Sequence, residues 1–279
     1  MTDREQAGAS LRKGVWLVRH GRAEEAIPYL EVAEKDAQLK FAPAALRAAR
    51  AIASGIDTVE VVLNDCSFHF VLESGNFGLD LHHVDGRFFE TEELLYCSQV
   101  VPHRSVVVDV GANTGNHLVF FIRFLKPRLA IPIEPVPQAI DVLRRNLQLN
   151  AMSVDMRGLG LAAGRETGRL SLKADEGSDL VVASVQERAV DDTAPAVACV
   201  RLDDLIEERV DFLKIDVEGF EDNVLLGADR ILSQDKPLLM LEMNDDKQSA
   251  LLAQISRYGY KSVKEFQGFN YKNVFCRVQ

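Results

Sequence analysis

The larger part of the chain, from Val106 onward, alternates short apolar runs with longer segments in which apolar residues recur at helical spacing. A short apolar run predicts a strand buried on both faces of a sheet, and helical spacing predicts an amphipathic helix. Strands are expected at 106–110, 130–134, 154–161, 210–216 and 237–242. Helices are expected at 118–125, 139–150, 202–206 and 249–258. A further helix is expected to follow a turn at 217–221 and to reach residue 232. Extended segments at 168–173 and 196–201 lie on either side of a polar loop at 175–190, and residues 260–265 and 270–278 are expected to close the chain as an antiparallel pair. The alternation indicates an α/β fold with a doubly wound sheet.

The N-terminal part of the chain has a different pattern, with apolar and alanine positions spaced for three helices between residues 8 and 54. Residues 17–30 look like the middle of a tetratricopeptide unit, and one such unit cannot bury its own apolar face. A helical cap is therefore expected at 1–56, packed on the main domain or on a second subunit; a peptide-binding array is the alternative. Residues 57–279 are expected to form the main domain, which begins with a β-hairpin at 58–72.

The region 75–104 connects the hairpin to the first strand of the expected sheet. It contains an amphipathic segment at 92–101 and the aromatic residues Phe77, Phe88 and Phe89. These rings suit the face of a sugar or another ring, and membership of the core is the alternative. We expect this region to lie over the carboxyl end of the strand 106–110.

The composition is that of a globular enzyme, and it narrows the choice of partners. Of the 279 residues, 47% are hydrophobic and 27% are charged. A chain of this length and hydrophobic content can bury a full core. The formal net charge is -10, and an acidic chain lacks the basic face that a nucleic-acid partner requires. No apolar stretch is long enough to span a bilayer, and the first residues lack the apolar core of a signal peptide. The four cysteines are scattered, which predicts reduced thiols in a cytoplasmic protein.

A glycine-containing loop follows the strand 106–110. Asp109, Gly111 and Gly115 stand in the order Asp-x-Gly-x-x-x-Gly, and a helical segment comes next. Strand, glycine loop and helix form the nucleotide site of open α/β sheets, with free N–H groups at the start of the helix. The spacing departs from the Gly-x-Gly-x-x-Gly of dinucleotide sites, which disfavours a dehydrogenase. Because an acidic strand end repels phosphates, the loop suits a ligand without phosphate groups.

Carboxylates stand at the ends of four expected strands, namely Asp109, Glu134, Asp216 and Glu242. In a doubly wound sheet the carboxyl ends of the strands meet along one side. Lys214 precedes Asp216 by two residues and therefore shares its face of the strand. Glu134 lies about twenty residues beyond the loop, where a carboxylate can accept both hydroxyls of a ribose. The alternative for Glu134 is a carboxylate that caps the turn after its strand. Together the four carboxylates and Lys214 indicate a ligand site.

Four sequence blocks, in order along the chain, resemble the FkbM family of S-adenosylmethionine-dependent methyltransferases. They are Val-Asp-Val-Gly-Ala-Asn-Thr-Gly-Asn-His at 108–117, Ile-Glu-Pro-Val-Pro-Gln-Ala-Ile at 133–140, Leu-Asp-Asp-Leu at 202–205 and Asp-Phe-Leu-Lys-Ile-Asp-Val-Glu-Gly-Phe-Glu at 211–221. The resemblance runs from about residue 88 to the C-terminus. It implies a Rossmann-like class I methyltransferase fold of seven strands, the last one antiparallel, and O-methylation of a hydroxyl, often on a sugar or a polyketide.

The resemblance also implies site residues, position by position. The loop would hold the amino-acid end of S-adenosylmethionine, and Glu134 would bind its ribose. The implied cofactor-binding residues are Asp109, Gly111, Ala112, Asn113, Gly115, Asn116, Glu134 and Asp216, and the implied substrate-binding residues are Phe88, Glu90, Glu221 and Glu242. The block 158–165 lacks the acidic residue that the family often has in its third strand, so Gly160 and Leu161 are backbone candidates for the adenine contact.

Methyl transfer to oxygen needs an aligned hydroxyl and a base that takes its proton. The implied catalytic residues are Asp216, Glu218, His117 and Lys214, with Glu221 as a further candidate base. Asp216 comes first because it ends the strand nearest the cofactor's methyl group in this fold. The alternatives are a helix-capping role for Glu218 and Glu221, and a packing role for His117. Lys214 would hold or neutralise Asp216.

The predicted function is transfer of a methyl group to a hydroxyl of a small molecule, such as a sugar, a glycan or a secondary metabolite. No nucleic acid and no membrane is expected as a partner, and the N-terminal helices are a candidate surface for a homodimer. No metal is predicted; Asp216, Glu242 and Asn244 as magnesium ligands are the alternative. A non-catalytic scaffold that recruits a partner through the helical cap is the rival hypothesis, although the loop and the block 211–221 are both intact. Asp-Val-Glu-Gly at 216–219 also differs from the Asn/Asp-Pro-Pro-Tyr/Phe of nucleic-acid methyltransferases.

Overall fold

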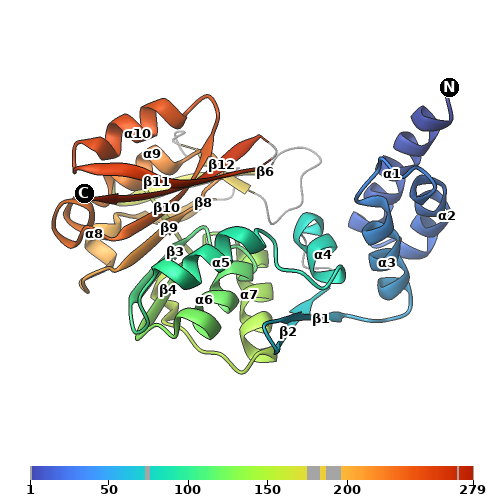
Figure 1. Ribbon diagram of the computed structural model, residues 1–279, viewed down its shortest axis with the longest axis horizontal. Helices are drawn as coiled ribbons and strands as arrows, with labels where there is room; N and C mark the ends of the chain where they lie inside the picture. The colour runs from blue at the N-terminus through green and yellow to red at the C-terminus, as the bar shows by residue number, and fades with distance from the viewer. Residues whose placement is uncertain (1, 73–75, 175–182, 187–195, 269, 279) are drawn as a thin grey trace. The chain divides into compact units, whose positions relative to one another are not determined.

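A computed structural model describes residues 2–72, 76–174, 183–186, 196–268 and 270–278. The chain forms two compact units, the first made of Met1–Phe89 with Gln148–Asn150 and the second of Glu90–Leu147 with Ala151–Gln279. Figure 1 follows the chain through both by colour. The domain boundary predicted between residues 56 and 57 lies inside the first unit, and it stays a prediction. No helix among the described residues is long and apolar enough to cross a membrane.

The first unit begins with three helices, α1 (Asp3–Arg19), α2 (Ala23–Glu34) and α3 (Ala42–Ala53). Thr2 and Glu5 form a capping box at the start of α1. Leu17 and Leu30 pack with the buried alanines of α2 and α3, so the apolar spacing of this part of the chain reflects a small helical core. The three helices that the pattern predicted are confirmed, whereas their role as a cap stays a prediction.

The first unit continues with a hairpin of β1 (Thr58–Leu63) and β2 (Cys66–Val71), followed by α4 (Phe77–Val84). Asn64 and Asp65 both have positive φ, as a tight two-residue hairpin turn requires. Helix α4 was not predicted. Phe88 packs edge-on against Phe68 and Phe70 of β2, with ring centroids 5.0 and 5.4 Å apart, and is only 2% exposed. Phe88 is therefore part of the core of the first unit.

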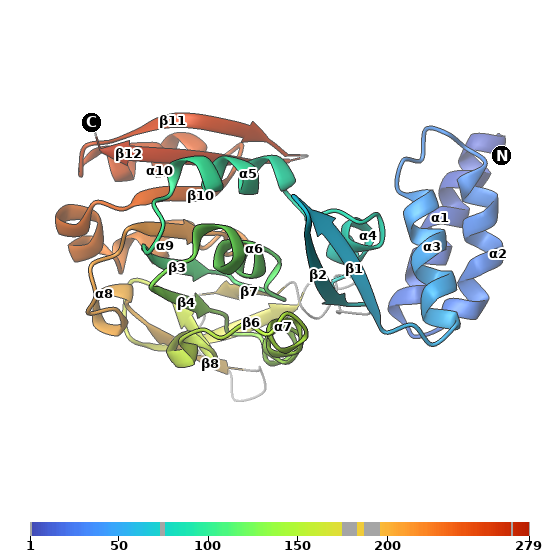
Figure 2. The same ribbon diagram turned by 60° about the horizontal axis from the view of Figure 1, so that its bottom comes forward.

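The main sheet of the second unit has six strands in the order β11-β12-β10-β9-β3-β4. Their bounds are Val106–Val110 for β3, Leu129–Ile133 for β4, Phe212–Ile215 for β9, Leu238–Asn244 for β10, Tyr260–Gln267 for β11 and Tyr271–Val278 for β12. Strands β4, β3, β9 and β10 are parallel, and β12 is antiparallel to both of its neighbours. Figure 2 shows the succession from β11 to β4. The predicted α/β fold with an antiparallel last strand is confirmed.

The strand predicted at 154–161 is wrong in its position. A 3₁₀ turn at Met156–Gly158 occupies the middle of it, and β5 begins only at Leu161 and ends at Ala163. Gly158 lies so close to β4 that a Cβ there would be 2.5 Å from the carbonyl oxygen of Pro132, and Gly160 turns the chain away with a φ of +88°. A single parallel bridge, Glu134 to Leu159, joins this segment to the end of β4. The main sheet among the described residues therefore has six strands rather than seven.

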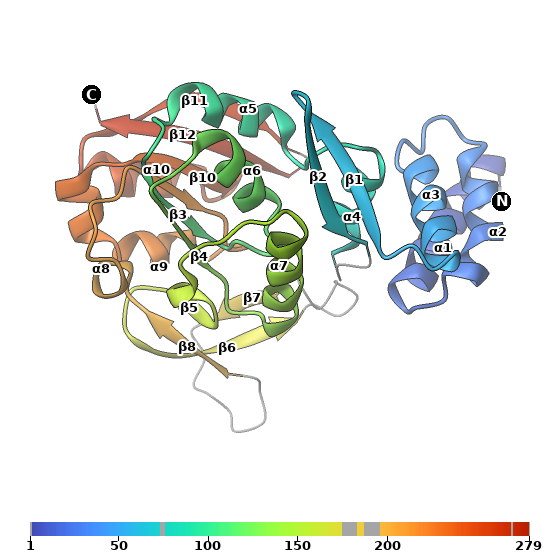
Figure 3. The same ribbon diagram turned by 90° about the horizontal axis from the view of Figure 1, so that it is seen from below.

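Strand β5 belongs to a second sheet with the order β5-β8-β6-β7 (Figure 3). Its other strands are β6 (Gly168–Ala174), β7 (Ala183–Gln186) and β8 (Ala196–Val200). The segments predicted as extended at 168–173 and 196–201 are thus confirmed as β6 and β8. Strand β7 falls within the predicted polar loop at 175–190, and the rest of that loop lies outside the described residues.

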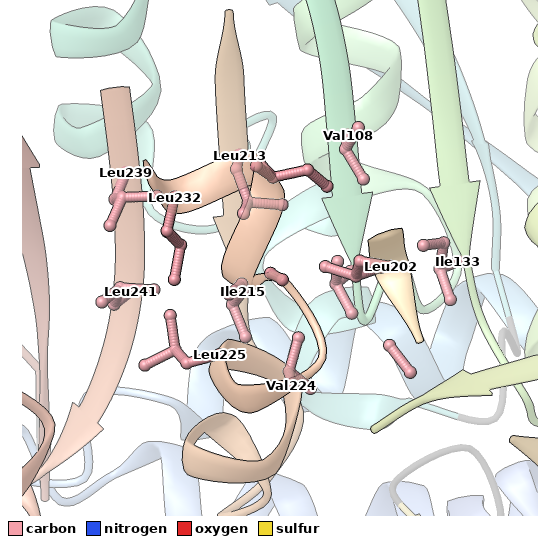
Figure 4. Packing of buried hydrophobic residues seen from close by; sticks show 14 of the residues in the cluster. Val108, Ile133, Leu202, Leu213, Ile215, Val224, Leu225, Leu232, Leu239 and Leu241 are labelled. Carbon is pink, nitrogen blue, oxygen red and sulfur yellow. The ribbon is translucent and has the colours of Figure 1, made fainter. Parts of the chain in front are cut away.

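Helices cover both faces of the main sheet (Figure 1). One face carries the apolar core, where Leu213, Ile215, Leu239 and Leu241 pack against α9 (Glu221–Leu226) and α10 (Gln248–Ser256), with α8 (Leu202–Leu205) alongside (Figure 4). The other face meets α5 (Thr91–Val100) and α6 (Asn116–Leu125), through Tyr96 on Phe275 and Phe121 on Phe212. Helix α7 (Pro137–Leu149) connects β4 to the 3₁₀ turn.

The helix predicted to reach residue 232 is interrupted. Gly227 is the C-cap of α9, and only glycine fits there, because a Cβ would lie 2.0 Å from the carbonyl oxygen of Gly164. A π-helical turn follows at Ile231–Asp235. Asp203, from the Leu-Asp-Asp-Leu block, accepts hydrogen bonds from the backbone N–H groups of Arg230 and Ile231. Asp203 thus holds the backbone at the start of the π-helical turn that leads to β10.

Candidate functional site

An ion-paired group lies at the carboxyl ends of β3 and β9. Asp109 and Lys214 are register partners on these parallel strands, so their side chains share one face of the sheet. The Lys214 Nζ lies 3.1 Å from Asp109 Oδ1 and 3.2 Å from Asp216 Oδ2. The Lys214 and Asp109 side chains are 2% and 0% exposed. Burial alone would lower the pKa of Lys214, but Asp109 and Asp216 hold it above its ordinary value, so the lysine is a permanent cation between two carboxylates.

The glycine loop is packed directly on the segment after β9. Gly111 has a φ of +76°, and a Cβ there would lie 1.7 Å from the carbonyl oxygen of Asp216. The Gly111 carbonyl accepts a hydrogen bond from Lys214 at 3.3 Å. Asn113 also has positive φ, and Gly115 is the N-cap of α6 with a φ of +89°. The loop and the Lys214 group therefore form one structure, which depends on glycine at position 111.

Glu134 follows β4 and closes the other side of the loop. Its Oε2 accepts a hydrogen bond from the Asn113 N–H at 2.8 Å, and its Oε1 accepts one from the Val136 N–H at 2.9 Å. Burial raises the pKa of Glu134 to about 7, against the opposing effect of these two hydrogen bonds and of Lys214. The turn-capping role that was the alternative for Glu134 is therefore present. Its predicted ribose contact stays a prediction.

The carboxylate of Glu221 holds the turn between β9 and α9. Its Oε1 accepts hydrogen bonds from the N–H groups of Gly219 at 2.8 Å and Val217 at 3.4 Å. Lys247 donates to the Gly219 carbonyl at 2.5 Å, and Glu218 lies in this turn with a φ of +52°. Burial raises the pKa of Glu221. Glu221 thus binds N–H groups of the turn before α9 rather than those of the helix itself, and its predicted substrate contact stays a prediction.

Glu90 binds three side chains from other elements of the second unit. Its Oε2 accepts a hydrogen bond from His117 Nε2 at 2.9 Å, and its Oε1 accepts bonds from the Tyr271 hydroxyl at 2.9 Å and from Asn273 Nδ2 at 2.6 Å. Tyr271 and Asn273 alternate on one face of β12, and sequence reasoning missed both. The only signal was their polar character on a strand whose other residues are mostly apolar.

Glu242 lies on β10 opposite Asn273. Burial raises the pKa of Glu242, and the nearby carboxylates of Asp216 and Glu218 raise it further. A protonated Glu242 can donate a hydrogen bond as well as accept one. Sequence reasoning identified this carboxylate but not the effect of its neighbours on its pKa.

The second unit thus brings together nearly all of the predicted site residues. Phe88 is the exception, because it belongs to the core of the first unit, and its predicted contact with substrate stays a prediction. Asp109 is the residue before the last one of strand β3, and further predicted residues follow β3, β4 and β9 along the chain; they are Gly111, Ala112, Asn113, Gly115, Asn116, His117, Glu134, Asp216, Glu218 and Glu221. Among the described residues, no group of three or more His, Cys, Asp or Glu side chains could hold a metal ion.

Comparison with known proteins identifies relatives. The family model for the methyltransferase FkbM domain matches residues 109–262. Methyltransferase sdnD from Sordaria araneosa is 29% identical over 161 residues, which cover 46% of this chain and 62% of that protein. Methyltransferase 1 from Beauveria bassiana is 30% identical over 151 residues, covering 46% of this chain and 60% of that protein. The chain therefore matches less than two thirds of the length of these curated relatives.

Solved structures are similar at a greater distance. The crystal structure of methyltransferase FkbM from Methylobacillus flagellatus is 19% identical, with a TM-score of 0.46, and the match covers 74% of this chain and 53% of that one. TYW2 from M. jannaschii, solved in complex with AdoMet, is 16% identical with a TM-score of 0.42, covering 79% and 84%. The family model matches more than half of the chain, and the chain belongs to the FkbM methyltransferase family.

Proposed function

We propose that this protein transfers a methyl group from S-adenosylmethionine to a hydroxyl of a small molecule, such as a sugar, a glycan or a secondary metabolite. The observation that carries the proposal is the group of Asp109, Lys214 and Asp216, packed against the Gly111 loop at the carboxyl ends of adjacent parallel strands. Ligands of doubly wound sheets bind at these ends. Membership of the FkbM family supports the same reaction class.

The residues present fit a cofactor that has an ammonium group and a ribose but no phosphate. Asp109 Oδ2 is buried and accepts no hydrogen bond from the described residues, so it can serve a donor. Each Glu134 oxygen accepts one N–H and keeps a lone pair for a hydroxyl. Lys214, the cation of the group, is already paired with two carboxylates. A pyrophosphate bound here would be repelled by the carboxylates of Asp109 and Glu134, and Lys214 would not be free to balance its charge.

Bound here, S-adenosylmethionine would supply an electrophilic methyl group. The chain's own residues would hold the acceptor oxygen in line with that group and take its proton. Asp216, Glu218 and His117 are the proposed candidates for the base, and Lys214 fixes the position of Asp216. Substrate contacts of Glu90, Glu221 and Glu242, a homodimer through α1–α3 and a cytoplasmic location stay predictions.

Calorimetric titration tests the cofactor. S-adenosylmethionine and S-adenosylhomocysteine should bind in the micromolar range and NAD should not. Asp109→Asn should abolish binding, because Lys214 loses a buried carboxylate partner and the cofactor loses the carboxylate proposed for its ammonium group. Asp229→Asn is the matched control, since its carboxylate bonds the Tyr258 hydroxyl away from the loop. Unchanged affinity in Asp109→Asn would remove the site assignment, and failure of every adenosyl compound to bind would favour the scaffold hypothesis. Binding would justify a screen of hydroxylated acceptors, sugars first.

The affinity for S-adenosylmethionine should depend on pH through Glu134. Its pKa is raised to about 7, so the carboxylate form that accepts ribose hydroxyls is lost as the pH falls through 7. Affinity should therefore weaken below pH 7, by at most about tenfold per pH unit, because the ligand must displace one proton. Titrations between pH 5.5 and about 8.5 measure the slope. Glu134→Gln has no titrating group at this position and should flatten the dependence of affinity on pH. An equal slope in both proteins would mean that Glu134 does not bind the ribose.

A further inference from the structure

Glu90, which directly precedes α5, accepts hydrogen bonds from three side chains of the second unit. Its side chain is 5% exposed, and that of its partner His117 is 8% exposed. Burial alone would raise the pKa of Glu90, but hydrogen bonds from His117, Tyr271 and Asn273 hold it below the ordinary value. Glu90 is therefore an ionised carboxylate, and an ionised carboxylate only accepts hydrogen bonds.

The backbone of Glu90 is also unusual. Its φ of +55° places a non-glycine residue in the left-handed region. Such a conformation persists only where the surroundings hold it, and it is enriched at functional sites. Here the surroundings are α6, which provides His117, and β12, which provides Tyr271 and Asn273. Three side chains from two separate elements thus hold one carboxylate.

The bond between Glu90 and His117 determines which imidazole nitrogen carries the proton. Because the carboxylate can only accept, Nε2 must donate across the 2.9 Å contact. In the neutral ring the lone pair is then on Nδ1. A carboxylate that fixes the tautomer of a histidine and balances its charge after proton uptake is the arrangement of a general base with its orienting group.

Asp216, the first candidate from the sequence, is in a less favourable position to act as the base. Its carboxylate lies 3.2 Å from the Nζ of Lys214 and is already paired with that buried cation. Uptake of a proton by Asp216 would weaken this ion pair, whereas uptake by His117 would strengthen the ion pair with Glu90. His117 stands in the first turn of α6, directly after the glycine loop.

We propose that Glu90 is a positioning residue which, held by Tyr271 and Asn273, fixes His117 with its proton on Nε2 and its lone pair on Nδ1 for uptake of the acceptor's proton. This inference rests on the proposed function. In the reaction the acceptor oxygen forms a bond to the methyl carbon, the carbon–sulfur bond breaks with its electron pair going to sulfur, and the hydroxyl proton passes to Nδ1. The imidazolium later releases that proton to water, so the charge balances.

Nuclear magnetic resonance of the full chain labelled with ¹⁵N-histidine tests the proposal without a known acceptor. Long-range proton–nitrogen spectra at a mildly alkaline pH distinguish the two neutral tautomers from the imidazolium, and His117→Gln assigns the signal among the six histidines. The wild-type protein should show the Nε2–H tautomer alone. Glu90→Gln should lose this single-tautomer pattern, because an amide can donate as well as accept. Tyr271→Phe should shift the same signals, because Glu90 loses a donor.

Tyr258→Phe is the matched control. It removes another tyrosine–carboxylate hydrogen bond, from Tyr258 to Asp229 at 2.8 Å, and should leave the His117 signals unchanged. An Nδ1–H tautomer or an imidazolium in the wild-type protein would overturn the proposal, as would a wild-type pattern in both Glu90→Gln and Tyr271→Phe. The same samples are titrated with S-adenosylmethionine. Absence of binding to the wild-type protein would refute the proposed function, and the tautomer result would still decide the role of Glu90.

Discussion

Lys214→Met should destabilise the protein by about 3–5 kcal/mol, the cost of removing one partner from a buried ion pair. The methionine fills similar space, but Asp109 and Asp216 lose the cation that lies 3.1 and 3.2 Å from them. Asp109 is 0% exposed and has no water to replace that cation. Urea denaturation measures the free energy of unfolding, and calorimetry should show loss of S-adenosylmethionine binding in the same protein.

The control for this substitution is Lys272→Met. Lys272 has a side chain that is 27% exposed, and its Nζ lies 3.6 Å from Glu265. Removal of such a partly exposed pair should change the free energy of unfolding by less than about 1 kcal/mol. The cost of Lys214→Met should also shrink on acidification, because protonation of the carboxylates removes the uncompensated charge. Equal effects of the two substitutions at neutral pH would contradict the structural role of Lys214.

Gly111→Ala should separate the loop from the strand end on which it packs. The new Cβ would lie 1.7 Å from the Asp216 carbonyl oxygen, so the backbone of the loop or of the turn after β9 must move. We expect a loss on the order of 100-fold in affinity for S-adenosylmethionine, the scale of effect that a displacement of about 1 Å has at a reacting site. Calorimetric titration measures it.

Gly55→Ala is the matched control for the backbone conformation. Gly55 has a φ of +77°, against +76° for Gly111, but no atom lies within 4 Å of an added Cβ. It should therefore cost only the roughly 1–2 kcal/mol of a left-handed alanine and leave affinity unchanged. If Gly111→Ala behaved like Gly55→Ala, the close contact with Asp216 would have no functional meaning.

The local pattern of apolar residues was sufficient to predict most helices and strands of the second unit. The apolar runs that became β3, β4, β9 and β10 are buried on both faces, and such strands can be recognised without knowledge of their neighbours. Strand-end carboxylates could also be predicted to lie together, because the carboxyl ends of parallel strands lie at the same edge of the sheet. Of the four carboxylates predicted to share a site with Lys214, Asp109 and Asp216 lie within ion-pair distance of it.

Errors arose where one segment is shaped by another that is distant in sequence. The strand predicted at 154–161 became a 3₁₀ turn because Gly158 lies against β4. The helix predicted to reach 232 is interrupted at Gly227, which lies against Gly164, and Asp203 binds the backbone N–H groups beyond it. Periodicity contains no information about such contacts.

The sequence by itself determined the α/β class, the parallel strands β3, β4, β9 and β10, and the chemistry available at the strand ends. These features depend on the spacing of apolar residues and on glycine and acidic residues within a few positions of each other. Only the tertiary structure decided that Glu90 is held by Tyr271 and Asn273, about 180 residues later in the chain. Hydrogen bonds between distant segments form only after the sheet has aligned them, and no local pattern specifies their partners.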